Sequence, residues 1–300
     1  MTADTPLYRG MNREELDREY NARGTVPDIA PFLEAYAALS AEARRDCEVF
    51  TDLAYGPSEA EKLDFFPAGE AGTAAPVFVF LHGGYWRLLS KEDSAFMAKP
   101  FVEAGIAVAA VDYALAPAVT LDEIVRQVRS AIAYLWHEAE RLGIDRERIY
   151  VGGSSAGGHL GGMVLAGDWQ AEFGVPDDVV AGGMLASGLF DLEPLRHCHV
   201  NEWMSLDEAS VARNSTLFSI PEKGARDCPL IVTWGGSETS EFKRQSRAYA
   251  EAWAAMGYSC EAFEIADRNH FDIILDLADP DRELTKRVLA MIAGGESREG

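Results

Sequence analysis

From residue 76 onward, short apolar runs alternate with stretches whose apolar residues recur at helical spacing. Residues 77–81 and 106–113 are such runs, and an unbroken apolar run is typical of a strand buried on both faces. Helical spacing is seen at Ile124, Val128, Ile132 and Leu135. Strands that alternate with helices in this way predict a mostly parallel sheet with helices on both faces, which is an α/β fold.

The remaining expected elements continue this order. Further strands are expected at residues 47–55, 62–66, 148–152, 179–185, 229–234 and 261–265. Further helices are expected at residues 91–104, 121–142, 156–167, 242–256 and 271–292. The first two strands are expected to form a hairpin, because Gly56, Pro57 and Ser58 lie between them.

We expect residues 1–300 to form a single domain, because no linker of Gly, Ser and Pro composition divides the chain. Residues 1–45 are expected to be a helical N-terminal segment. Residues 191–224 lack an obvious strand and are expected to form a cap insertion near the mouth of the sheet. The sequence leaves open whether either segment forms a lid, and whether the N-terminal segment makes contacts in a homodimer.

Acidic residues outnumber basic ones by 49 to 27, which gives a formal net charge of −22 and a pI near 4.6. This charge argues against nucleic acid and against an anionic membrane surface as partners. The longest apolar runs are far shorter than the roughly 20 residues of a membrane span. No signal peptide is visible, and the four scattered cysteines form no CxxC pair, so we expect a reduced, cytoplasmic setting.

The segment Gly152-Gly153-Ser154-Ser155-Ala156-Gly157 lies between an expected strand and an expected helix. Only Ser155 has glycines two residues before and two residues after it, as a G-x-S-x-G motif requires. A nucleophilic serine needs a tight, strained turn that leaves little room for neighbouring Cβ atoms. The alternative is a glycine-rich turn that binds phosphate or only packs. A dinucleotide fingerprint is disfavoured because the spacing is not G-x-G-x-x-G.

A second motif, Leu81-His82-Gly83-Gly84-Tyr85-Trp86, directly follows the apolar run at residues 77–81. Two successive glycines let backbone N–H groups approach a substrate carbonyl, so Gly83, Gly84 and Ala156 are the expected oxyanion-hole donors. The N–H group of Tyr85 is a candidate third donor from this loop. His82 is expected to hold the loop rather than transfer a proton. The alternative is a plain tight turn.

Together these motifs resemble the α/β-hydrolase fold. HGGxW is similar to the signature of the kynurenine formamidase (arylformamidase) branch, which is close to the hormone-sensitive-lipase-like esterases. The likeness extends through residues 112–117, 155–160, 241–246 and 269–271 and covers roughly residues 60 to 293. It implies a serine hydrolase without cofactor or metal that cleaves a small ester or amide, with a role in tryptophan catabolism.

A serine nucleophile needs a histidine base, and that histidine needs a carboxylate. His270 is the expected base, because it follows the last expected strand. Glu238 is the expected acid, although the family usually has Asp at this place. Glu241 and Asp191 are the alternatives. His197 and His199 flank Cys198, but an HxH pattern lacks further ligands at a suitable spacing, so no metal is expected.

The leading hypothesis is that Ser155 attacks the formamide of N-formyl-L-kynurenine and forms an acyl-enzyme that water cleaves. Tyr85 and Trp86, with Trp203 as a further candidate, are expected to wall an aromatic leaving group; the alternative for Trp86 is a place in the core. No basic residue is evident for an amino-acid carboxylate. One alternative is a carboxylesterase for short acyl esters. Another is a non-catalytic binding protein with the same fold.

Overall fold

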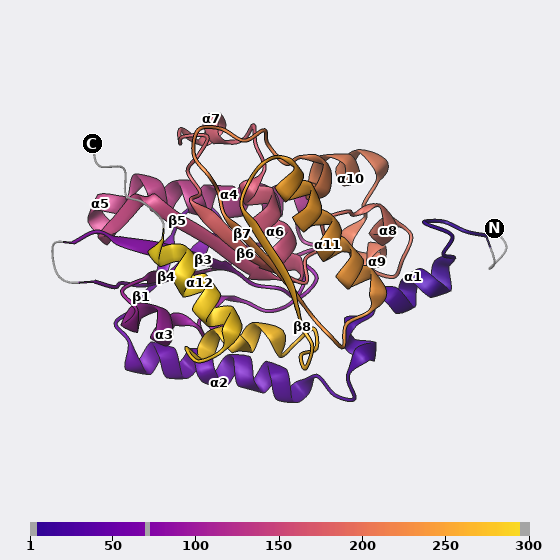
Figure 1. The fold of residues 1–300 in the computed structure, drawn as a ribbon, viewed down its shortest axis with the longest axis horizontal. Helices are drawn as coiled ribbons and strands as arrows, with labels where there is room; N and C mark the ends of the chain where they lie inside the picture. Colours follow the sequence, from indigo (N-terminus) through magenta and orange to yellow (C-terminus); the bar gives the residue numbers. More distant parts are fainter. Residues whose placement is uncertain (1–4, 70–72, 295–300) are drawn as a thin grey trace.

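The expected alternation of strands and helices builds one mixed sheet. The computed structural model describes residues 5–69 and 73–294. Its strands follow the order β1-β2-β4-β3-β5-β6-β7-β8 across the sheet (Figure 1). The strands are β1 (Phe50–Ala54), β2 (Lys62–Phe66), β3 (Ala75–Leu81), β4 (Ala107–Val111), β5 (Ile144–Ser154), β6 (Gly182–Ala186), β7 (Leu230–Gly235) and β8 (Cys260–Ile265). β1 pairs with β2 and β2 with β4 in antiparallel register, and every other neighbouring pair is parallel.

Helices cover both faces of this sheet, as the sequence predicts for the α/β-hydrolase fold (Figure 1). The α-helices are α1 (Arg13–Glu19), α2 (Ala30–Asp46), α3 (Ala98–Glu103), α4 (Leu121–His137), α5 (Ala139–Leu142), α6 (Ala156–Leu165), α7 (Gln170–Phe173), α8 (Glu193–Arg196), α9 (Asn201–Met204), α10 (Glu208–Asn214), α11 (Ser240–Ala255) and α12 (Glu283–Ala293). The 3-10 helices are η1 (Ala22–Thr25), η2 (Lys91–Asp93), η3 (Thr216–Phe218) and η4 (Ile273–Ala278).

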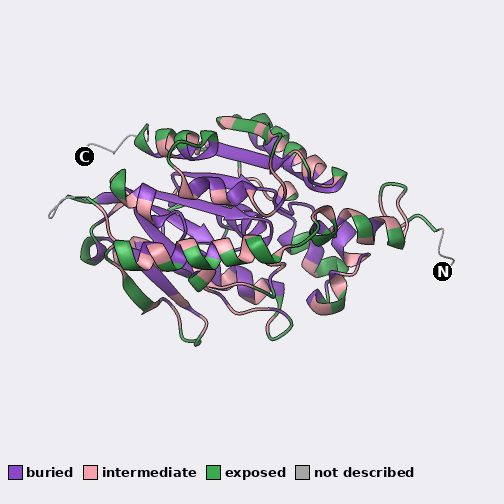
Figure 2. Ribbon diagram, turned by 90° about the horizontal axis from the view of Figure 1, so that it is seen from below, coloured by how far each residue is buried: buried purple, intermediate pink, exposed green. Residues whose placement is uncertain are grey.

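The two faces of the sheet have separate cores. Alternate residues of β3 supply them: Val77 and Val79 belong to the core beneath α4, α6 and α11, whereas Phe78 and Phe80 belong to the core beneath α2, α3 and α12. All four side chains are almost fully buried. Figure 2 shows the result, with buried strands inside and exposed faces on the outer helices.

The parallel arrangement brings distant parts of the chain to one edge of the sheet. The segments that follow β3, β5, β7 and β8 leave the carboxyl ends of these strands. Carboxyl ends of parallel strands lie at the same edge, which is where α/β proteins bind ligands. This edge therefore receives the loop at residues 82–84 (the HGG loop), the turn that contains Ser155 (the serine turn) and the residues expected to supply the acid and the base.

Several boundaries differ from the sequence expectation. The helix expected at residues 91–104 is only η2 followed by the short helix α3, in whose first turn Pro100 lies. Proline has no N–H to donate, so a helix begins close to it rather than runs through it. The helix expected at residues 121–142 is divided into α4 and α5 at Glu138.

Both segments whose role the sequence left open are helical where they are described. The N-terminal segment contains α1, η1 and α2, and residues 1–4 of that segment lie outside the described residues. Residues 191–224 contain α8, α9, α10 and η3, and no strand is assigned there. Among the helices of residues 5–69 and 73–294, none is long and apolar enough to cross a membrane.

Candidate active site

Ser155 occupies the turn between β5 and α6 in a backbone conformation that favours glycine, with φ of +58° and ψ of −120°. Its N–H donates to the carbonyl of Ala186 at 2.9 Å, which ties the turn to the neighbouring strand. A Cβ atom on Gly157 would overlap the carbonyl oxygen of Leu81, and one on Gly153 would overlap Gly157 itself. The glycines of the motif are therefore required by close backbone approach, as expected. Ser154 is still part of β5 and is not at the turn.

His270 and Glu238 lie side by side at the same edge. Nδ1 of His270 is 3.1 Å from Oε2 of Glu238, and both side chains are nearly fully buried. Oε1 of Glu238 accepts hydrogen bonds from Oγ of Ser187 at 2.5 Å and from the N–H of Gly235 at 2.6 Å. A carboxylate at Nδ1 assigns the proton to that nitrogen, which leaves Nε2 as a base.

The two alternative acids, Glu241 and Asp191, interact with side chains other than His270. Glu241 accepts a hydrogen bond from the Tyr20 hydroxyl at 2.8 Å and forms an ion pair with Arg244 at 2.8 Å. Asp191 accepts a hydrogen bond from the Tyr8 hydroxyl at 2.5 Å. Neither carboxylate contacts His270 in the described part of the chain, so the geometry favours Glu238.

Two other histidines are buried for structural reasons. His159 lies in α6, accepts a hydrogen bond from Nε1 of Trp86 at Nδ1, and contacts the carbonyl of Asn214 through Nε2. His82 stacks on Tyr113, with ring centroids 4.1 Å apart. Burial lowers the pKa of both imidazoles to about 4, so each is neutral near pH 7.

Asp17, Cys198 and His199 bring three potential metal ligands within 4.8 Å of one another. Asp17 already forms an ion pair with Arg13 at 2.9 Å and accepts a hydrogen bond from the His199 backbone. Burial raises the pKa of the Cys198 thiol to about 12, which favours the protonated form over the thiolate that metals bind. We therefore interpret this cluster as a packing contact between α1 and residues 191–224.

The HGG loop brings backbone donors next to the serine turn. A Cβ atom on Gly83 would lie 2.9 Å from the carbonyl oxygen of Ser154 and 3.5 Å from Cβ of Ser155. Within residues 5–69 and 73–294, the N–H groups of Gly83, Gly84 and Ala156 have no hydrogen-bond partner. Free N–H groups beside a nucleophile are the arrangement that stabilises an oxyanion.

His82 and Tyr113 hold this loop from behind. Nδ1 of His82 is 2.9 Å from the carbonyl oxygen of Gly83, and the hydroxyl of Tyr113 donates to the carbonyl of His82 at 2.7 Å. The sequence predicts this positioning role for His82.

Tyr85 and Trp86 have different positions. Tyr85 lines the cavity beside Ser155, and its hydroxyl donates to the carbonyl of Tyr20 at 2.5 Å. Trp86 is fully buried and does not line the cavity, which departs from the expectation of a substrate contact. Its indole N–H instead donates to His159 at 3.3 Å. Trp203, from residues 191–224, donates to the carbonyl of Tyr85 at 3.2 Å.

The cavity that contains Ser155 and His270 has a volume of about 270 Å³ and a mostly apolar wall. Aromatic side chains supply much of this wall: Tyr36, Phe80, Tyr85, Phe96 and Phe271. The N-terminal segment contributes residues from Ala22 to Tyr36, whereas no residue of 191–224 lines it. Of the two segments whose role was open, the N-terminal one walls the site.

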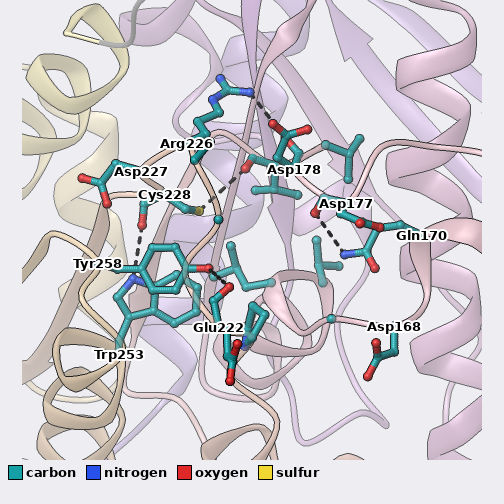
Figure 3. Close-up of a pocket in the computed structure, with 18 residues that line it drawn as sticks. Asp168, Gln170, Asp177, Asp178, Glu222, Arg226, Asp227, Cys228, Trp253 and Tyr258 are labelled. Atoms are coloured by element: carbon teal, nitrogen blue, oxygen red, sulfur yellow. Dashed lines mark hydrogen bonds between the residues drawn. The ribbon is translucent and has the colours of Figure 1, made fainter.

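A larger cavity of about 540 Å³ lies at the amino ends of β6 and β7, at the opposite edge of the sheet (Figure 3). Trp253 and Tyr258 lie beside each other there. Cys228 donates its thiol to the carbonyl of Val180 at 3.7 Å, and burial raises its pKa to about 12. This thiol is therefore a poor nucleophile, and the larger cavity does not contain the expected chemistry.

Sequence analysis did not identify Ser187, which contacts Glu238. It follows β6, has a positive φ of +51°, and donates to Glu238 as described above. Ser187 follows β6, which lies between β5 and β7 in the sheet. This position is the one signal that would have located Ser187 at the carboxyl edge of the sheet.

Comparison with known proteins identifies the family to which this chain is related. A family model described as BD-FAE matches residues 63–175. Kynurenine formamidase of Salmo salar is 32% identical, and that of Danio rerio 31%; each match spans 95% of this chain and 98% of the relative.

The chain belongs to the kynurenine formamidase family. A solved structure of a candidate thioesterase from Silicibacter sp. tm1040 is 29% identical, with a TM-score of 0.77 over 93% of this chain and 99% of that one. The kynurenine formamidase family and its structural neighbours are hydrolases with the α/β-hydrolase fold. The chain is accordingly a hydrolase, and a small ester or amide fits its site.

Proposed function

We propose that the protein hydrolyses the formamide of N-formyl-L-kynurenine, with Ser155 as nucleophile, His270 as base and Glu238 as acid. The observation that carries this proposal is the 3.1 Å contact between His270 and Glu238 beside a cavity that Ser155 also lines. The two fish relatives are named kynurenine formamidase, which supports N-formyl-L-kynurenine as the substrate.

The mechanism follows from these positions. His270 removes the proton from the Ser155 hydroxyl through Nε2, and the oxygen attacks the formyl carbon. The N–H groups of Gly83, Gly84 and Ala156 donate to the resulting oxyanion. His270 then gives its proton to the leaving aryl amine, and a formyl-enzyme remains. Water, deprotonated by His270, attacks that ester; as the bond to Ser155 breaks, His270 returns the proton to the Ser155 oxygen and formate is released.

A carboxylesterase for short acyl groups is the second candidate, because the same groups serve ester hydrolysis. The 270 Å³ cavity favours a small acyl group in either case. The similarity to a candidate thioesterase supports this alternative. A non-catalytic binding protein is the third candidate; failure of Ser155 to react with an organophosphonate would support it.

The first test compares kcat/KM for N-formyl-L-kynurenine with kcat/KM for p-nitrophenyl acetate, in the wild type and in Ser155→Ala. We expect preference for the formamide and a loss of at least about a thousandfold in Ser155→Ala. Ser154→Ala is the matched variant and should keep measurable turnover. Ester turnover without formamide hydrolysis would favour the carboxylesterase, and full activity of Ser155→Ala would contradict the mechanism.

We further propose that residues 1–300 act as one domain in the cytoplasm, without cofactor, metal or nucleic acid. The net charge of −22 supports the last point. A homodimer remains the alternative to a monomer, although the N-terminal segment here walls the cavity of its own chain. Light scattering distinguishes the two states, and activity should survive dialysis against a chelator.

A further inference from the structure

The mostly apolar cavity beside Ser155 is also lined by one Arg and one Asp side chain. Among the described residues, Arg23 and Asp93 are the only Asp, Glu, Lys or Arg residues that line it, and the two lining histidines are His82, which is neutral, and His270, which contacts Glu238. Arg23 comes from the N-terminal segment and Asp93 from η2, which follows the HGG loop. Two separate segments thus bring one cation and one anion to the same small cavity.

The guanidinium of Arg23 is available. Arg23 is exposed, and no ion pair or hydrogen bond joins its side chain to another residue of 5–69 or 73–294. Its backbone is held, because Asn21 accepts a hydrogen bond from the N–H of Gly24 at 3.2 Å and Thr25 donates to the carbonyl of Ala22 at 2.7 Å. A fixed backbone thus presents an unpaired cation at the cavity.

The carboxylate of Asp93 also lacks a cationic partner. Asp93 is half-buried and accepts one side-chain hydrogen bond, from the hydroxyl of Ser90 at 3.2 Å. The nearest basic residue in sequence, Lys91, is occupied: its Nζ lies 3.0 Å from Asp64 and 2.6 Å from Glu92. No ion pair to Asp93 occurs within the described chain.

We propose that Arg23 and Asp93 form a head-group subsite, in which Arg23 binds the α-carboxylate and Asp93 the α-ammonium of an amino-acid substrate. This inference rests on the proposed function and adds to it the residues that would select the substrate. The aromatic wall then accommodates the aryl ring between the head group and Ser155.

The charge pattern distinguishes a zwitterion from other small ligands. An anion such as a dicarboxylate would meet repulsion from Asp93, and a simple cation would meet repulsion from Arg23. A neutral ester would displace water from both charges without replacing its hydrogen bonds, which costs binding energy. An α-amino acid supplies one partner for each charge.

The experiment combines variants with matched ligands. The variants are Arg23→Gln and Asp93→Asn, with Arg18→Gln and Asp281→Asn as controls at exposed residues that do not line the cavity. The substrates are N-formyl-L-kynurenine, its decarboxylated analogue N-formylkynurenamine, and the neutral N-(2-acetylphenyl)formamide. Inhibition of p-nitrophenyl acetate hydrolysis by L-kynurenine measures head-group binding without the formamide reaction.

We expect Arg23→Gln to raise KM for N-formyl-L-kynurenine and Ki for L-kynurenine by roughly tenfold, since a hydrogen-bonded charge is lost. The same variant should leave KM for the neutral formamide within about twofold, and it should lower KM for the cationic decarboxylated analogue or leave it unchanged, because repulsion from Arg23 is removed. Asp93→Asn should weaken binding of the three ligands that carry an ammonium group: N-formyl-L-kynurenine, N-formylkynurenamine and L-kynurenine. The two control variants should behave as the wild type.

Failure of this inference differs from failure of the proposed function. If the wild type hydrolyses N-formyl-L-kynurenine but Arg23→Gln and Asp93→Asn change neither KM nor Ki, the subsite is wrong and the function stands. If the wild type hydrolyses the neutral formamide and ester only, the proposed substrate is wrong. In that case Ki for L-kynurenine still decides the subsite: a rise in both variants supports it, and an unchanged or unmeasurable Ki overturns it.

Discussion

Glu238 accepts three hydrogen bonds with its two carboxylate oxygens. One oxygen contacts His270, and the other is shared by the Ser187 hydroxyl and the Gly235 N–H. All three partners present a hydrogen toward it, so both carboxylate oxygens act as acceptors. Glu is one methylene longer than Asp. Its carboxylate contacts His270 and also accepts a hydrogen bond from the N–H of Gly235 at the end of β7.

Glu238→Gln tests this arrangement. The amide has one accepting oxygen, so at least one of the three donors would face an N–H group. We expect kcat/KM to fall roughly a thousandfold or more, because the histidine loses its tautomer and its counter-charge. Steady-state kinetics measures the fall. Glu241→Gln is the matched control, because Glu241 lies three residues away and contacts Tyr20 and Arg244 instead; an equal loss there would contradict the assignment.

At the scale of elements, the N-terminal segment is joined to the beginning of α11. One carboxylate oxygen of Glu19 accepts hydrogen bonds from the Ser240 hydroxyl at 2.7 Å and from the N–H of Glu241 at 3.0 Å. Thr239, the N-cap residue, makes no side-chain cap bond and instead donates to the carbonyl of Glu19 at 2.6 Å. Glu19 therefore caps a helix more than 200 residues away, and α11 begins two residues after Glu238.

Glu19→Ala should weaken both elements together. Loss of a cap typically costs about 1 kcal/mol, and a carboxylate at a helix N-terminus adds a favourable dipole contact. We expect the free energy of unfolding in urea to fall by about 1–2 kcal/mol. The matched control is Glu14→Ala, since Glu14 is exposed on the same short helix and, among the described residues, forms no hydrogen bond or ion pair with α11. Equal stability of the two variants would refute the capping role.

The sequence predicted those features that depend on local pattern. Apolar runs located most strands, and the G-x-S-x-G spacing selected Ser155 over Ser154, because both follow from backbone geometry that neighbours in sequence impose. Features that depend on contacts between distant segments were not predicted. Ser187 and Arg23 reach the site only because the fold brings β6 and the N-terminal segment to the same edge of the sheet. Trp86 lies outside the cavity lining and donates a hydrogen bond to His159 instead.

At the scale of the whole molecule, two buried histidines and one half-buried carboxyl make stability depend on pH in opposite directions. The folded pKa of His82 and of His159 is about 4, below the usual value near 6.5, because of burial. Burial raises the pKa of Asp112 to about 6, and Asp112 lies 3.8 Å from His82. The two types of group therefore have to be separated by variants.

Between pH 6.5 and about 4, the unfolded chain binds protons at both histidines that the folded chain does not bind. Stability rises with pH wherever the unfolded state binds more protons, so acidification through this range destabilises the fold. Each histidine accounts for a loss on the order of 3 kcal/mol over the full range. Asp112 acts oppositely, since the folded state takes up its proton from about pH 6 downward.

His159→Gln isolates one of these contributions. A glutamine amide can accept from Trp86 and donate to the carbonyl of Asn214, but it does not titrate. We expect the free energy of unfolding of this variant to fall less steeply than that of the wild type from pH 6.5 to 4.5. Asp112→Asn should fall more steeply, because the opposing proton uptake is removed. Urea unfolding at closely spaced pH values measures all three slopes, and parallel curves would show that these groups do not control the acid stability of the fold.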